Sequence, residues 1–468
     1  MTRQTDPLSL TLLAAARCLA DVESGRSLTD AVAQTPAANR SAVQAVTYYA
    51  MRHWGLAQAW RAFALKKTPS DPVLNSLAAL GLLLMDIALI NANQAPPDSH
   101  QAPLGDDAPS YAPHTLVDQA VAAVGQARLP KSCAGLINAV LRRFQRERAS
   151  FVQHVEQDPV ARWGYPTWWQ KKIKAAFPEQ WKEILQVSQT PPALVLRVNR
   201  RRAEVASVLA EFERSGVRAH GLGDSAIVVS STGAVGKLPG FAQGWWSVQD
   251  LGAQRAATLL PIKAGSRVLD ACAAPGGKAA HLLELADIEL TALDSSPSRL
   301  ARVKENLDRL GLMSSRTRLL AADARKPNDW WDGIPFDAIL ADVPCTASGV
   351  VRRHPDIAWL RRPSDVAQSA TLAREILDSL WPLLAPGGHL LLVTCSVFPE
   401  EGEQQASYMQ SKHADAIRLP APGQCLPSPG DGLQKPGEDG FFYALFEHAH
   451  DNTAQTTPLV QSADDPRL

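Results

Sequence analysis

The stretch Val268-Leu269-Asp270-Ala271-Cys272-Ala273-Ala274-Pro275-Gly276-Gly277-Lys278 joins a short apolar run to a tight turn and the start of a helix. Glycines let a backbone approach a ligand closely, and a helix N-terminus offers free amides to an anion. From about residue 250 onward, strand-like and helix-like segments alternate, with strands expected at 268–271, 290–293, 319–321, 338–341 and 389–393. This alternation predicts a Rossmann-like α/β fold, in which helices cover both faces of a parallel sheet.

The next predicted strand ends in a carboxylate, Asp294, which is placed to accept hydrogen bonds from two ribose hydroxyls. The dinucleotide fingerprint GxGxxG is absent, and this weakens an NAD interpretation. A nucleoside with a small charged end fits the turn better, and S-adenosylmethionine is the obvious candidate, with its carboxylate near Lys278. A tight turn without any ligand is the alternative.

Two further apolar runs each stop at a polar tip that carries a cysteine. The first tip is Asp342-Val343-Pro344-Cys345, and the second is Thr394-Cys395-Ser396. In an open α/β sheet, ligands bind outside the carboxyl ends of the strands. If the two strands are neighbours, roughly 4.8 Å apart, both thiols face one crevice. Such a pair suggests chemistry in which one sulfur attacks and the other handles departure.

The cysteine usage excludes other roles for these thiols. The 468 residues contain six cysteines, without a CxxC pair or a Cys/His cluster. This argues against a disulfide framework and against a structural metal site, so no metal is expected. The remaining cysteines are interpreted as small buried hydrophobic residues; they are Cys18, Cys133, Cys272 and Cys425.

Composition indicates a soluble cytoplasmic protein. The formal net charge is zero, so any attraction to nucleic acid must come from local basic patches. The N-terminus lacks the charged-then-apolar order of a signal peptide. The longest apolar run, 77–85, is interrupted by Gly81 and is far too short to span a membrane.

The spacing of apolar residues changes along the chain, and this predicts several domains. Residues 1–155 show only helical spacing, with helices expected at 9–22, 43–65, 72–90, 116–126 and 133–148. Residues 156–245 read as a small α+β module, and 246–449 as the α/β domain. Residues 91–114 predict an exposed loop, and 450–468 a disordered tail.

The motifs in the α/β domain resemble the motif series of the S-adenosylmethionine-dependent RNA cytosine-C5 methyltransferases. The resemblance rests on 270–278, Asp294, Asp323 and the two cysteine tips, and it runs from about 245 to 445. The stretch 135–144 is similar to the all-helical NusB-type RNA-binding domain. Together the two parts resemble the bacterial 16S ribosomal RNA cytosine-C5 methyltransferases over nearly the whole chain. One departure is Thr346-Ala347, where many relatives have Ser-Gly.

The resemblance implies a class I methyltransferase domain and assigns roles to residues. Cys395 would attack C6 of cytosine, and Cys345 would assist the later elimination. Asp342 would hydrogen-bond the Watson–Crick edge of the base, although a plain loop cap is its alternative. The residues expected to hold S-adenosylmethionine are Ala273, Ala274, Pro275, Gly276, Gly277, Lys278, Asp294, Asp323 and Asp342.

Four arginines follow the first cysteine tip, namely Arg352, Arg353, Arg361 and Arg362, with Trp359 among them. Arginines interleaved with an aromatic residue suit phosphate contact and base stacking, which makes them candidates for RNA binding. A solvated charged face is the ordinary alternative. The expected partner is 16S ribosomal RNA, either free or partly assembled, and the protein is expected to be a monomer.

Two other functions remain open from the sequence. The same chemistry would serve a transfer RNA substrate, although the NusB-like half argues against it by analogy. A protein of another class, an RNA-binding assembly or antitermination factor with a degenerate methyltransferase domain, is the third hypothesis. Intact Cys345, Cys395, Asp294 and Asp342 count against degeneracy.

Overall fold

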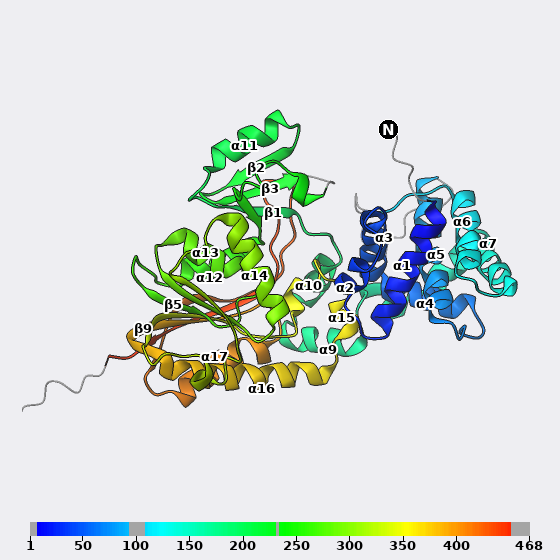
Figure 1. The fold of residues 1–468 in the computed structure, drawn as a ribbon. Helices are drawn as coiled ribbons and strands as arrows, with labels where there is room; N and C mark the ends of the chain where they lie inside the picture. Colours follow the sequence, from blue (N-terminus) through cyan, green and yellow to red (C-terminus); the bar gives the residue numbers. More distant parts are fainter. Residues whose placement is uncertain (1–6, 93–107, 231–233, 451–468) are drawn as a thin grey trace, which may run out of the picture.

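The computed structural model describes residues 7–92, 108–230 and 234–450. Figure 1 shows a helical region at the N-terminal end, a small sheet, and a larger sheet covered by helices. The predicted tail lies outside the described residues except for His450, and so does most of the predicted 91–114 loop. The predicted multidomain fold, all-α, then α+β, then α/β, is confirmed.

The N-terminal region is helical, as predicted. Its helices are α1 (Leu8–Glu23), α2 (Leu28–Ala33), α3 (Arg40–Arg52), α4 (Trp54–Ala64), α5 (Pro72–Asn91), α6 (Pro113–Gln126) and α7 (Lys131–Val155). The single helix predicted over 43–65 is two helices, because His53 between them leaves helical geometry at φ −111° and ψ 20°. The likeness of this region to a NusB-type domain stays a prediction.

Helix α5 is longer and more apolar than the run noticed in the sequence. By length and composition it is the one helix among the described residues that would reach across a membrane. Most of its side chains are buried against its helical neighbours, above all α1 and α7. Its acidic residue Asp86 pairs with Arg148 of α7 at 2.5 Å. Burial inside the helical core accounts for its apolar composition.

Three short helices follow, and they pack against the segments after strands β8 (Phe336–Asp342) and β9 (Leu384–Thr394) of the larger sheet. They are α8 (Pro159–Trp163), α9 (Thr167–Ala176) and α10 (Trp181–Ser188). Trp163 and Trp169 belong to a hydrophobic cluster that also contains Val351, Val397 and Phe398. These tryptophans are core residues, as the sequence interpretation favoured. The cluster seats the helices beside the segments that carry the two cysteines.

The middle module is a sheet with strand order β2-β3-β1-β4 and one flanking helix. Its elements are β1 (Leu194–Val198), α11 (Val205–Arg214), β2 (Arg218–Leu222), β3 (Ala226–Ser230), η1 (Val235–Lys237) and β4 (Trp246–Val248). Because β4 pairs with β1, the sheet extends just past the boundary predicted at 245. Fully buried Arg197 of β1 hydrogen-bonds Glu284 at 2.7 and 2.8 Å and the carbonyl of Gly277 at 2.8 Å. The module is thereby fastened to the helix that follows the predicted cofactor turn.

The larger sheet has strand order β10-β11-β9-β8-β5-β6-β7 in the described chain. Its strands are β5 (Arg267–Asp270), β6 (Glu289–Asp294), β7 (Thr317–Ala321), β8 (Phe336–Asp342), β9 (Leu384–Thr394), β10 (Ala416–Cys425) and β11 (Phe441–His448). The five strands predicted as parallel pair in parallel. Strands β10 and β11 were not predicted, and they pair antiparallel beyond β9. The sheet is therefore mostly parallel.

Helices cover both faces of this sheet, and the strand order defines its ligand-binding edge (Figure 1). One face carries α12 (Leu251–Leu259), α13 (Gly277–Leu285) and α14 (Pro297–Leu310), and the other carries α16 (Pro363–Leu380) and α17 (Glu403–Lys412). From β5 the chain builds outward to β6 and β7, and then returns to the other side of β5 through β8. This reversal places a crevice at the carboxyl ends of β5 and β8.

Candidate active site

The two cysteine tips lie side by side, as predicted. Strands β8 and β9 are parallel neighbours, and Asp342 is in register with Val393. Each strand is buried and ends at its polar tip, so both tips leave the same edge of the sheet. The Sγ atoms of Cys345 and Cys395 are 3.6 Å apart, and both cysteines are free thiols.

A cavity of about 790 Å³ opens at this edge. Both cysteines line it, as do the turn after β5 and the ends of β6 and β8. Of the residues predicted to hold a cofactor, it is lined by Ala273, Ala274, Pro275, Gly277, Lys278, Asp294, Asp323 and Asp342. Gly276 does not line it. The sequence motifs therefore converge on one cavity although they are spread over more than a hundred residues of chain.

Gly276 lies in the turn after β5 and packs away from the cavity. The φ of Gly276 is +99°, in the left-handed region that favours glycine, and a Cβ at this residue would meet Val303 of α14 at 3.1 Å. Gly276 is thus required by the backbone of the turn and by close packing. Gly277, the first residue of α13, faces the cavity.

Asp294 is held at the end of β6 by backbone amides. Its carboxylate accepts from Ser296 N at 2.9 Å and from Ala274 N at 3.3 Å, and it is 3% exposed. Arg299, which sequence reasoning missed, lies 3.5 Å from this carboxylate and also lines the cavity. Asp323 faces the same space, where hydrogen bonds from Arg325 lower its pKa.

Asp270 is a second carboxylate in the cavity wall, and its chemistry was missed from the sequence. It ends β5, is 1% exposed, and neither of its carboxylate oxygens has a hydrogen-bond partner in the described structure. Burial, together with the nearby Asp342 carboxylate, raises its pKa to about 7. A buried acceptor without a donor suits a cationic group bound in the cavity.

Lys278 and Asp342 form an ion pair beside the thiols, 2.6 Å between Nζ and Oδ2. Burial alone would lower the pKa of Lys278, but the charges of Asp342 and of Cys395 raise it above its ordinary value. The pKa of Cys345 is raised well above its usual range, chiefly by its hydrogen bond with Cys395 and next by burial. The hydrogen bond between the two thiols therefore favours the protonated form of Cys345.

Comparison with known proteins shows the family to which the chain belongs. A family model described as "16S rRNA methyltransferase RsmB/F" matches residues 257–447, and a model of the RsmF/B-like ferredoxin-like domain matches 165–236. The "Ribosomal RNA small subunit methyltransferase B" of Vibrio cholerae is 42% identical over 340 residues, which are 72% of this chain and 77% of that protein. The chain belongs to the RsmB/F family of 16S rRNA methyltransferases. The resemblance inferred from the motifs is confirmed.

Further relatives agree with this family. The protein of the same name from Pseudomonas syringae is 44% identical over 66% of this chain and 69% of its own length. Among solved structures, "Crystal Structure of PH0851" superposes with a TM-score of 0.71 at 24% identity, over 94% of this chain and 98% of that one. The structure of NSun6 from Pyrococcus horikoshii with SFG gives 0.54 at 22% identity, over 61% and 99%. These two solved structures support the fold of this chain.

The predicted RNA-binding arginines of this RsmB/F family member do not share one environment. Arg352 is 3% exposed, lies 3.9 Å from a carboxylate oxygen of Asp439 and donates to Ser428 O at 3.2 Å. Arg353 pairs with Asp439 and, at 2.6 Å, with Asp250. Internal carboxylates neutralise both arginines, and Arg353 also lines the cavity at the sheet edge; RNA contact by Arg352 and Arg353 stays a prediction.

The other two arginines differ from this pair. Arg361 donates through Nε to Thr346 O at 3.1 Å, which supports the loop after Cys345, and it also lines the cavity. Arg362 is exposed. RNA contact by Arg361 and Arg362 stays a prediction.

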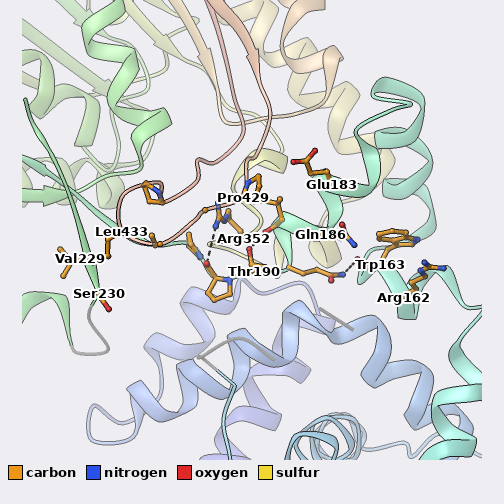
Figure 2. A pocket seen from close by; sticks show the side chains of 18 residues that line it. Arg162, Trp163, Glu183, Gln186, Thr190, Val229, Ser230, Arg352, Pro429 and Leu433 are labelled. Carbon is orange, nitrogen blue, oxygen red and sulfur yellow. Dashed lines mark hydrogen bonds between the residues drawn. The ribbon is translucent and has the colours of Figure 1, made fainter. Parts of the chain in front are cut away.

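A second cavity, of about 900 Å³, lies between the helices α8 and α10, strand β3 and the loops after β8 and β10. Figure 2 shows Arg162, Trp163, Glu183 and Gln186 on one side, Val229 and Ser230 of β3 on another, and Arg352 beside Pro429. It is larger than the cavity at the sheet edge but contains none of the thiols or strand-end carboxylates. Within the described ranges, no three His, Cys, Asp or Glu side chains gather in a way that suits a metal ion.

Proposed function

We propose that the protein transfers a methyl group from S-adenosylmethionine to C5 of a cytidine in 16S ribosomal RNA, in the cytoplasm. The observation that carries the proposal is the pair of free thiols 3.6 Å apart at the cofactor-sized cavity. The names of the relatives support ribosomal RNA of the small subunit as the substrate.

Methylation of cytosine at C5 needs one group that adds to C6 and another that removes the C5 proton, and two thiols suit these tasks. C5 is a poor nucleophile until a group adds to C6 and makes the ring enamine-like. A thiolate adds readily and also leaves readily. After C5 has gained the methyl group, loss of the C5 proton re-forms the C5–C6 double bond and breaks the bond between C6 and sulfur. One sulfur serves the addition, and a second group must handle the proton.

The electrostatics support Cys395 as the sulfur that adds to C6. The hydrogen bond between the thiols favours the proton on Cys345. The ammonium group of Lys278 lies close enough to Cys395 that a charge on this sulfur raises the pKa of Lys278. Once Cys395 is bonded to C6, the hydrogen bond that holds the proton on Cys345 is weakened, so Cys345 releases this proton to water and then accepts the C5 proton as the C6–sulfur bond breaks. Asp342, held by Lys278, faces the same space and is assigned to the polar edge of the base.

The residues around the turn fit S-adenosylmethionine. The unpartnered carboxylate of Asp270 matches the ammonium group of an amino acid, and Asp294 matches the two hydroxyls of a ribose. The first residue of α13, Gly277, turns its helix end to the cavity, where free amides suit a carboxylate. When bound, the cofactor supplies an electrophilic methyl group; the protein residues hold it, exclude water and orient the base.

A trapping experiment tests the proposal. RNA that carries 5-fluorocytidine at the target cannot lose fluorine as a cation after methylation, so the sulfur–C6 bond persists. The wild-type protein with S-adenosylmethionine should form a protein–RNA species that survives denaturing electrophoresis, and Cys395→Ala should form none. Mapping of 5-methylcytidine in 16S RNA, from cells with and without the protein, identifies the position. No adduct and no lost methylation would refute the proposed function.

A further inference from the structure

We infer that Glu401 is a positioning residue that clamps the Cys345 and Cys395 loops together and so fixes the distance between the two thiols. Glu401 ends the short η5 helix (Pro399–Glu401) and is 1% exposed. It does not line the cavity at the sheet edge, so it acts through its neighbours. The inference rests on the proposed function, because it concerns the two-thiol reaction.

The contacts of Glu401 join the residues that directly follow the two cysteines. One carboxylate oxygen accepts from Thr346 N at 2.7 Å. The other accepts from Thr346 Oγ1 and from Ser396 Oγ, each at 2.6 Å. Thr346 follows Cys345 in the chain, and Ser396 follows Cys395. A single side chain thus bridges the ends of two adjacent strands, one residue beyond each thiol.

A carboxylate in this place carries a cost that an apolar residue would avoid. Burial raises the pKa of Glu401, while hydrogen bonds from Ser396 and Thr346 oppose that rise. An apolar side chain would fill the same volume, but it would leave the buried amide of Thr346 without an acceptor. Charged acceptors form the stronger hydrogen bonds, so the clamp is stiff.

The two residues that follow the cysteines, Thr346 and Ser396, do not depend equally on Glu401 for their hydrogen bonds. Ser396 Oγ also meets Ser348 Oγ at 2.8 Å and accepts from Phe398 N at 3.0 Å, and Cys395 O accepts from Gly349 N at 2.9 Å. Ser396, the residue after Cys395, therefore keeps hydrogen bonds when Glu401 is removed, and the bonds from Ser348 and Gly349 still join the two loops.

Thr346 has fewer ties. Both of its donors point to Glu401, and its carbonyl accepts from Arg361 at 3.1 Å. Loss of Glu401 should therefore release Thr346, and Cys345 next to it, more than Ser396 and Cys395. Under the proposed function, addition of Cys395 to C6 would then be slowed less than the release step that Cys345 assists. Adduct should accumulate.

The distance between the thiols has a chemical probe that needs no RNA. Phenylarsine oxide condenses with two thiols, forms two arsenic–sulfur bonds and releases water, and it binds firmly only where both sulfurs reach one arsenic. We expect one bridge in the wild type, lost in Cys345→Ala, and about tenfold weaker bridging in Glu401→Ala. Glu401→Gln, which keeps one acceptor oxygen, should fall between. Glu400→Ala is the matched control, since Glu400 pairs with Lys172 at the surface.

The reaction provides the second readout. With substrate RNA, Glu401→Ala should lengthen the lifetime of the sulfur–C6 adduct about tenfold while slowing its formation less, and Glu401→Gln should do so to a smaller extent. General destabilisation would lower the active fraction without changing the ratio of the two rates. Unchanged bridging and an unchanged ratio in both variants would overturn the inference. If the wild type itself bridges arsenic but forms no adduct, the proposed function fails and the clamp stands.

Discussion

The Sγ atom of Cys345 lies 3.6 Å from the Sγ atom of Cys395, in van der Waals contact and within reach of a shared proton. This contact follows from the sheet, because parallel neighbours β8 and β9 bring their carboxyl ends to one edge. The contact also favours the protonated form of Cys345, because this hydrogen bond is the first cause of its raised pKa. Distinct behaviour of the two thiols is the main experimental consequence.

Alanine at each cysteine should separate the two roles. Cys395→Ala should bind RNA and cofactor yet form no adduct. Cys345→Ala should add to C6 and methylate but fail to release, and so accumulate as a denaturation-resistant protein–RNA species on gels. Cys425→Ala, which removes a half-buried thiol outside the cavity, serves as the control and should behave like the wild type. The reversed pattern would make Cys345 the nucleophile, and full activity in either variant would refute the two-thiol mechanism.

Replacement of Asp294 should weaken cofactor binding. Asp294→Asn removes a charged acceptor that backbone amides hold in place, and such a loss costs about 1.5–3 kcal/mol, at least about tenfold in the dissociation constant. Calorimetry with S-adenosylmethionine measures this directly. Asp287→Asn, which alters an exposed carboxylate paired with Arg316, should leave the affinity unchanged. Tight NAD binding in place of S-adenosylmethionine binding would contradict the cofactor assignment.

Asp270 should make both stability and cofactor affinity depend on pH. Its folded pKa is about 7, above the ordinary value of 3.8, so the folded state holds a proton that the unfolded state has released. This contribution to stability is therefore fully present below pH 4 and is lost as pH rises to 7. Asp270→Asn should raise the melting temperature of the cofactor-free protein at pH 8 relative to the wild type.

The same substitution should act in the opposite direction on binding. The ammonium group of the cofactor favours the charged carboxylate, so wild-type affinity should increase between pH 6 and 8 as Asp270 loses its proton. Asp270→Asn should bind more weakly and show a flatter pH profile in calorimetry. Equal profiles for the two proteins would show that Asp270 does not face the bound cation.

The arginines after Cys345 should divide into structural and RNA-binding residues. Arg352→Ala removes the buried hydrogen bond to Ser428 O and a cation 3.9 Å from Asp439, which Arg353 still pairs, so it should lower the unfolding free energy by about 1–3 kcal/mol. Chemical denaturation measures this. Arg362→Ala should leave stability unchanged, weaken RNA binding and lower the salt slope by about 1. Lost RNA affinity with intact stability in Arg352→Ala would reverse the assignment.

Signals that are local in the sequence predicted most of the site. The turn 270–278, Asp294 and the two cysteine tips each follow a buried strand directly, and the order of parallel strands then brings them to one edge. Strand β10 escaped prediction because its Pro, Gly and half-exposed residues read as a loop. Strand β11 is apolar from Phe441 to Phe446, but nothing in its own residues shows that it runs antiparallel to β9.

Roles that depend on partners distant in the chain could not be predicted from the sequence. Arg352 and Arg353 read as a basic surface because Asp250 and Asp439, which neutralise them, lie far away in the chain. Glu401 sits in the run Pro399-Glu400-Glu401, where either acidic residue would pass as a solvated helix start. Only the packing of η5 under the two cysteine loops distinguishes Glu401, which is buried, from Glu400, which pairs with Lys172 at the surface.

Arg197 gives the middle sheet a direct mechanical link to the cofactor turn. Because it bonds both Glu284 of α13 and the carbonyl of Gly277, strand β1 does not shift without moving the first residue of that helix. We expect a ligand that docks on the middle module to be coupled through Arg197 to the cavity at the sheet edge. By thermodynamic reciprocity, a filled cavity biases what the module binds. Bound RNA should then change the affinity for the cofactor by the same factor by which bound cofactor changes the affinity for RNA.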